Sequence, residues 1–64
     1  ELLSHREHQV YLLLTQGHTV SEIGAQLSLA PNTVSTYRAR ILEKTGTKND
    51  VELALYAQSL SGGR

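Results

Sequence analysis

The stretch TVSEIGAQLSLAPNTVSTYRARI, residues 19–41, holds the join between two expected helices and decides the fold. Thr19 and Glu22 have the spacing of a capping box, which marks the start of a helix. Pro31 suits the first turn of a second helix, because its missing N–H costs no hydrogen bond there. The stretch therefore predicts a short helix, a turn of about three residues and a longer helix over 31–45, which is helix-turn-helix spacing.

Two further helices are expected, one on each side of this motif. Ser4 and Glu7 form another capping box, and Gly17 is expected to end the helix that follows them. Asn49 and Glu52 form a looser version of the same signal, since Asn is also a favoured N-cap residue. A helix therefore precedes the motif and another follows it.

The last helix is expected to run to about Leu60, with residues 61–64 as a frayed tail. No strand pattern, internal repeat or linker interrupts residues 3–60. The predicted fold class is all-α, a four-helix bundle that forms one domain over residues 1–64. Because the chain opens directly before its first helix signal, we expect it to be a C-terminal fragment of a longer regulator.

Size and composition exclude several functions. A chain of 64 residues buries only about 60% of its unfolded surface, so a deep catalytic cleft is hard to build. The absence of cysteine excludes disulfides and thiolate metal sites. The longest apolar run, residues 10–14, is too short to span a bilayer. We expect no enzyme activity, no cofactor and no membrane partner, and a cytoplasmic location.

Three histidines raise the question of a metal site. His5 and His8 are three residues apart and share one side of the first helix, whereas His18 falls in the turn beyond its end. Zinc needs at least a third protein ligand, and no carboxylate is assigned near His18. Surface histidines explain the pattern better, and no metal site is predicted.

Charge is unevenly distributed although the net charge is zero. Residues 1–30 sum to minus two and residues 49–64 to minus one. Residues 31–48 carry four basic side chains against Glu43 and sum to plus three. A local positive field attracts a polyanion even when the total is neutral. Nucleic acid is therefore a candidate partner, with a solvated helix face as the alternative.

The helix over 31–45 has two distinct faces at about 100° per residue. Val34, Tyr37 and Ile41 point inward, while the outward face is small and polar. Small residues suit a helix that lies deep in the major groove, where hydroxyl, amide and methyl groups contact base edges and flanking cations contact phosphates. The candidate DNA-contacting residues are Asn32, Thr33, Ser35, Thr36, Arg38, Ala39, Arg40 and Lys44.

The predicted core includes Ile23, Val34, Ile41 and Leu53. Gly24, in the middle of a helix, costs about 1 kcal/mol of propensity and is expected to let another helix approach closely. On the last helix, the inner side is expected to hold Leu53, Tyr56, Ala57 and Leu60. The opposite side is apolar where a monomer should be polar, and it is the predicted dimer interface: Val51, Ala54 and Leu55.

These features resemble the LuxR-type helix-turn-helix domain of NarL/FixJ-type response regulators and quorum-sensing regulators. The matching segments are LSHREHQV at 3–10, Gly17, SEIGAQLSLAPNTVSTYRARILEKTG at 21–46 and VELALYA at 51–57. The resemblance implies a four-helix fold in which residues 31–45 are the recognition helix and the last helix supplies the homodimer contact.

The resemblance also implies how the recognition helix binds. In the family, the position of Ser35 is often a DNA-contacting Lys, the position of Ala39 can be one as well, and the position of Thr36 contacts bases. Here both lysines are absent and Arg38 and Arg40 stand nearby, which indicates that the phosphate contacts have moved. Ala30 replaces the usual Ser or Thr cap, so the start of this helix is weakly capped.

The function that follows is sequence-specific binding of double-stranded DNA and regulation of bacterial transcription, as effector domain of a two-component response regulator. An upstream receiver domain and a homodimer on DNA, weak or monomeric alone, are the expected partners. A quorum-signal-binding domain is the alternative upstream. Two other interpretations are a protein-interaction helical bundle without DNA binding and a sigma-factor-like promoter-recognition domain.

Overall fold

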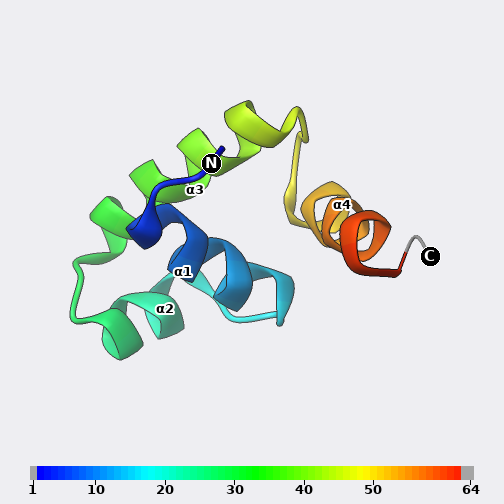
Figure 1. Cartoon of the computed structure of the whole chain (residues 1–64). Helices are drawn as coiled ribbons and strands as arrows, with labels where there is room; N and C mark the ends of the chain where they lie inside the picture. The colour runs from blue at the N-terminus through cyan, green and yellow to red at the C-terminus, as the bar shows by residue number, and fades with distance from the viewer. Residues whose placement is uncertain (1, 63–64) are drawn as a thin grey trace.

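The computed structural model describes residues 2–62, and the side chains of residues 2–60. This part of the chain contains no strand, and the all-α prediction is confirmed. The bundle measures 35 × 20 × 19 Å along its principal axes. Figure 1 shows α3 lying across α1 and α2, with α4 beside them and seen almost end-on. The four helices are α1 (His5–Thr15), α2 (Val20–Leu27), α3 (Pro31–Thr45) and α4 (Asp50–Gly62).

The first two capping boxes form as predicted. The Ser4 and Glu7 pair caps α1, and the Thr19 and Glu22 pair caps α2; in each, the N3 carboxylate accepts the cap N–H at 2.9 Å. α1 ends at Thr15, directly before the turn at Gln16 and Gly17.

The third cap differs from the prediction. Asn49 Oδ1 accepts the Glu52 N–H at 2.9 Å, but the Glu52 carboxylate accepts the N–H of Lys48 and not that of Asn49. α4 extends to Gly62, so the frayed tail expected over residues 61–64 is wrong for residues 61 and 62, and residues 63–64 lie outside the described part.

The turn between α2 and α3 is compact and explains Gly24. Ser28 ends α2 in the left-handed region at φ 59°, and the Leu29 N–H donates to the Gly24 carbonyl at 2.8 Å. A Cβ at Gly24 would lie 2.6 Å from the Leu29 carbonyl oxygen and 3.7 Å from a Val34 methyl. α3 therefore approaches Gly24 through Val34, as expected, but the closest neighbour is the backbone of the turn that follows α2.

The core joins side chains from all four helices. Each fully buried aliphatic side chain contributes about 1.5–3 kcal/mol relative to an exposed one. All four predicted core residues are completely buried. Separately, Ala30 makes no side-chain cap at the start of α3, as expected. The buried apolar residues are Val10, Tyr11, Leu14, Ile23, Val34, Ile41 and Leu53.

α4 packs against α1 through part of its predicted inner side. Leu53 is fully buried, and Tyr56 meets Tyr11 edge-on with ring centroids 6.4 Å apart. Leu60 is 66% exposed, so its predicted place in the core is wrong. The helical period points it inward, and it lines an open hollow with His8, Tyr11 and Tyr56, but that hollow leaves most of its side chain in solvent.

Candidate nucleic-acid interface

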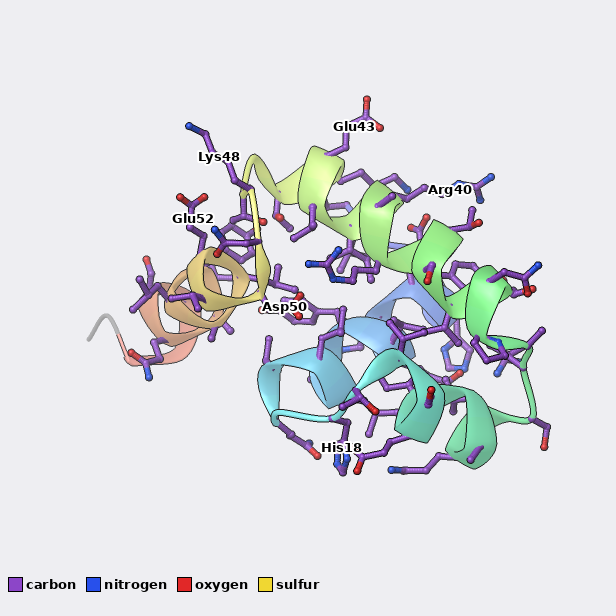
Figure 2. All side chains as sticks on the ribbon, turned by 180° about the vertical axis from the view of Figure 1, so that it is seen from behind. His18, Arg40, Glu43, Lys48, Asp50 and Glu52 are labelled. Atoms are coloured by element: carbon purple, nitrogen blue, oxygen red, sulfur yellow. The ribbon has the colours of Figure 1, made fainter. Side chains whose placement is uncertain are left out.

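The outward face of α3 is open to solvent, as the sequence predicts. Val34 and Ile41 hold the opposite face at zero exposure, which fixes the rotation of the helix. Figure 2 shows Arg40 and Glu43 projecting from α3 away from the bundle. The predicted contact residues that are exposed are Asn32, Thr33, Ser35, Thr36, Ala39, Arg40 and Lys44.

Two polar groups on this face are partly engaged by the helix itself. Asn32 Oδ1 accepts the Thr33 N–H at 3.0 Å, which leaves the amide NH₂ as a donor. The Thr36 hydroxyl donates to the Asn32 carbonyl at 3.1 Å, which leaves its oxygen as an acceptor and its methyl exposed. Asn32 is therefore set up to donate to a base edge, and Thr36 to accept or to contact a thymine methyl.

Arg38 differs from its neighbours in being part of an internal ion pair. Its Nε donates to Asp50 Oδ1 at 2.8 Å, and its side chain is only 33% exposed. Asp50 is the first residue of α4, so the pair connects the recognition helix to the next helix. The predicted phosphate contact of Arg38 is thus occupied by a carboxylate in the free domain.

Lys44 forms the second internal ion pair. Its Nζ lies 2.7 Å from Glu7 Oε1, and the Ser4 N–H donates to the same oxygen at 2.9 Å. The hydrogen bond from Lys44, followed by that from the Ser4 backbone, lowers the pKa of Glu7. Because Glu7 is 3% exposed, Lys44 compensates a buried charge that joins α1 to α3.

These two ion pairs engage two of the four basic side chains in residues 31–48. Within the described residues of the basic segment, only Arg40 and Lys48 have basic side chains with no ion pair. Lys48 is exposed in the turn after α3 and projects outward in Figure 2. The sequence interpretation did not include Lys48 as a contact, although its place just beyond Gly46, in the basic segment, was a usable signal.

The outer side of α4 presents two large apolar side chains. Val51 is 70% exposed and Leu55 is 59% exposed, while Ala54 between them is half-buried. This surface, here called the α4 stripe, consists of Val51, Ala54 and Leu55. Its exposure is what an interface requires, and the described chain itself does not cover it.

Two of the three histidines are exposed, and the third lies beside a helix cap. His5 and His8 are exposed, and His18 Nδ1 lies 3.4 Å from the cap carboxylate of Glu22. Among residues 2–62, no cluster of His, Cys, Asp or Glu could hold a metal ion. In the same range, no helix combines the length and apolar character needed to cross a membrane.

The helix spacing, the buried inner side of α3 and its open outer face define a helix-turn-helix domain. Over residues 1–57 the sequence matches the family described as "Bacterial regulatory proteins, luxR family", and the chain belongs to that family. The match confirms the predicted resemblance and favours it over the sigma-factor alternative. The chain is accordingly a DNA-binding domain that acts in transcription regulation.

Several curated proteins are similar to the chain. Transcriptional regulatory protein UhpA of Salmonella typhimurium is 56% identical over 81% of the chain, which spans 26% of that protein. Response regulator GacA of Pseudomonas aeruginosa is 51% identical over 86% of the chain and 26% of its own length. Response regulator UvrY of Escherichia coli K12 is 49% identical over 80% of the chain and 23% of its length. The chain thus spans about a quarter of these relatives, and no solved structure matches it.

Proposed function

We propose that the chain binds specific double-stranded DNA by inserting α3 into the major groove and so regulates bacterial transcription. The observation that carries the proposal is the outward face of α3, small, polar and exposed, on a helix held by buried Val34 and Ile41. A merely solvated helix needs no such run of short side chains. A helix that lies in the major groove needs short side chains, because long ones would keep its axis away from the base edges.

Each exposed group has a chemical role in this arrangement. The Asn32 amide donates to an adenine or guanine edge, the Ser35 hydroxyl accepts from or donates to exposed base atoms, and the Thr36 oxygen accepts. Ala39 contacts a thymine methyl. Arg40, at the flank and without an acidic partner among the described residues, contacts a phosphate and positions the helix without selecting a sequence.

The domain is proposed to be the effector part of a two-component response regulator. GacA and UvrY carry the name response regulator, and the chain spans about a quarter of each. The remaining length of such a protein has room for an upstream receiver domain, whose phosphorylation would control the effector. Bacterial DNA lies in the cytoplasm, and the proposal places the protein there.

Two copies are proposed to bind together through the α4 stripe. One recognition helix covers only a few base pairs, and the formally neutral domain gains little long-range attraction to DNA. A small stripe is too little to offset the entropy of association in solution, which costs several kcal/mol or more. We therefore expect a monomer in free solution and a dimer on two half-sites about one helical turn apart.

Selection from a pool of random-sequence duplexes tests the function with no operator sequence chosen in advance. The domain should enrich a motif with two half-sites, and affinity should fall steeply with salt through counterion release. Gln16→Ala, an exposed change at the end of α1, is the control variant and should enrich the same motif. Absence of any enriched motif, together with salt-independent binding to protein partners, would instead support a protein-interaction bundle.

A further inference from the structure

The ion pair between Arg38 and Asp50 lies at one flank of the proposed DNA-contacting face. It spans α3 and the first turn of α4, with 2.8 Å between Nε and Oδ1. Figure 2 shows Asp50 at the start of α4, on the side of that helix turned toward the rest of the bundle. Arg40, on the other flank of α3, has no acidic partner among the described residues. The two flanking arginines are therefore not equivalent.

The geometry of this pair allows exchange. Of the five N–H donors of the guanidinium, only Nε–H has a hydrogen-bond partner within the described residues. The side chains of Arg38 and Asp50 are 33% and 52% exposed, so water competes with the contact and the pair contributes little to stability. A phosphate oxygen offers the same guanidinium a charge-assisted bond of at least equal quality.

The electrostatics of the flank depend on the same carboxylate. With Asp50 bound, the charges of Arg38 and Asp50 cancel locally, and a phosphate arriving at this flank meets an acidic neighbour. Releasing Arg38 restores one positive charge to the recognition helix. The pair thus subtracts one phosphate contact from the domain.

We propose that Asp50 limits the affinity of the domain for DNA by holding Arg38 away from the phosphate backbone. Asp50 and a DNA phosphate compete for the same guanidinium, and in the parent complex Asp50 keeps Arg38, so the side-chain contact between α3 and α4 persists and this phosphate contact does not form. Asp50 thereby couples the recognition helix to the helix that carries the α4 stripe. This inference rests on the proposed function and adds to it the residue that sets the strength of the phosphate contact.

The variant Asp50→Asn tests the proposal, because Asn retains the size of Asp and is well tolerated near a helix start. Binding to a random-sequence duplex, measured by fluorescence anisotropy over a salt series, should strengthen about three- to tenfold at 0.1 M salt. The slope of log affinity against log salt should steepen by about one unit, which corresponds to one further phosphate contact. Circular dichroism and thermal unfolding verify that the variant is folded, and Asp50→Ser provides an independent substitution with the same expected result.

Two comparisons separate the release of Arg38 by the loss of Asp50 from a general loss of negative charge. Glu43→Gln also removes one negative charge, from an exposed residue of α3 with no ion pair in the described structure, and should change affinity without adding a full unit of slope. In an Arg38→Gln background, Asp50→Asn should leave the salt slope unchanged. Equal slope changes with and without Arg38 would overturn the proposal.

The direction in which the Asp50 variants change DNA affinity is equally decisive. Weaker binding by Asp50→Asn and Asp50→Ser would show that Asp50 orients Arg38 toward DNA, which contradicts the proposed competition. If the parent domain binds duplex DNA but all variants share its slope, only this inference fails. A parent that binds no duplex at all would overturn the proposed function, and this inference with it, before any variant is made.

Discussion

The ammonium of Lys44, in the last turn of α3, lies 2.7 Å from the carboxylate of Glu7, in the first turn of α1. The same Glu7 oxygen accepts the N–H of the cap residue Ser4. One buried carboxylate therefore closes the start of α1 and attaches the proposed recognition helix to it. Lys44, which the sequence suggests as a DNA contact, has this stabilising role in the folded domain.

The first prediction concerns pH. The hydrogen bonds from Lys44 and Ser4 lower the pKa of Glu7 in the folded state, so its contribution to stability is complete above the ordinary glutamate pKa. That contribution is lost as pH falls through the lowered, folded-state pKa. Chemical denaturation at a series of pH values should show stability decreasing below about pH 5.

Glu7→Gln is the informative variant for this pH dependence. It retains an oxygen for the Ser4 N–H but removes the charge that Lys44 compensates. The variant should be less stable at neutral pH and should lose less stability on acidification. Glu22→Gln is the matched control, because Glu22 also has a lowered pKa, chiefly through the Thr19 N–H, but is exposed. An unchanged acid response in Glu7→Gln would show that other carboxylates dominate.

The second prediction separates base contacts from phosphate contacts. Asn32→Ala and Thr36→Ala should relax sequence preference at particular operator positions, since each good base contact discriminates by about 1–3 kcal/mol. Arg40→Ala should weaken binding to all sequences alike and reduce the salt slope by about one unit. Anisotropy on a selected and a scrambled duplex measures both. Equal losses on the two duplexes for all three variants would contradict this division.

The third prediction concerns the core. Ile41 is fully buried on the inner side of α3, and Ile41→Ala should cost about 2–5 kcal/mol. A domain of this size has a total stability of about 3–10 kcal/mol, so much of the population should unfold at 37 °C. Urea denaturation measures the loss, with the half-buried Leu42 as a comparison, because Leu42→Ala should cost clearly less.

The fourth prediction is that Gly24→Ala lowers stability, although helix propensity alone would raise it. Propensity favours Gly24→Ala by about 1 kcal/mol, but the added Cβ would lie 2.6 Å from the Leu29 carbonyl oxygen. Overpacking costs about 1–3 kcal/mol, and backbone cannot move aside as a flexible side chain would. We expect a net loss of about 1 kcal/mol or more in the free energy of unfolding. Ala25→Gly, at the exposed neighbouring position, measures the effect of helix propensity alone. A Gly24→Ala variant more stable than the parent would contradict the close contact between Gly24 and Leu29.

The fifth prediction tests the α4 stripe. Leu55 is 59% exposed, so Leu55→Glu should leave the monomer folded with nearly the parent's stability. It should abolish cooperative occupancy of a duplex with two half-sites while retaining binding to one, as measured by gel shift. Leu12→Glu makes the same chemical change at a 44% exposed position on α1 and should retain cooperativity. Parent-like cooperativity in Leu55→Glu would place the dimer face elsewhere.

Local sequence signals are sufficient to define the helices and the family. Helix starts and ends depend on neighbouring groups, such as the N–H of Glu22 and the hydroxyl of Thr19, which lie three residues apart in any conformation that forms the cap. Periodicity also identifies the inner residues of α3, because Val34 and Ile41 share a face whatever they pack against. These features are encoded within one or two helical turns.

Tertiary packing determines which cations remain free and where the core ends. Lys44 and Glu7 are 37 residues apart in sequence, and Arg38 and Asp50 are 12 apart, so no local pattern pairs them. Leu60 satisfies the inward period of α4, yet it borders an open hollow beside α1 and is 66% exposed. Burial and charge pairing depend on how helices meet in space, and a long side chain can turn to whichever partner packing brings within reach.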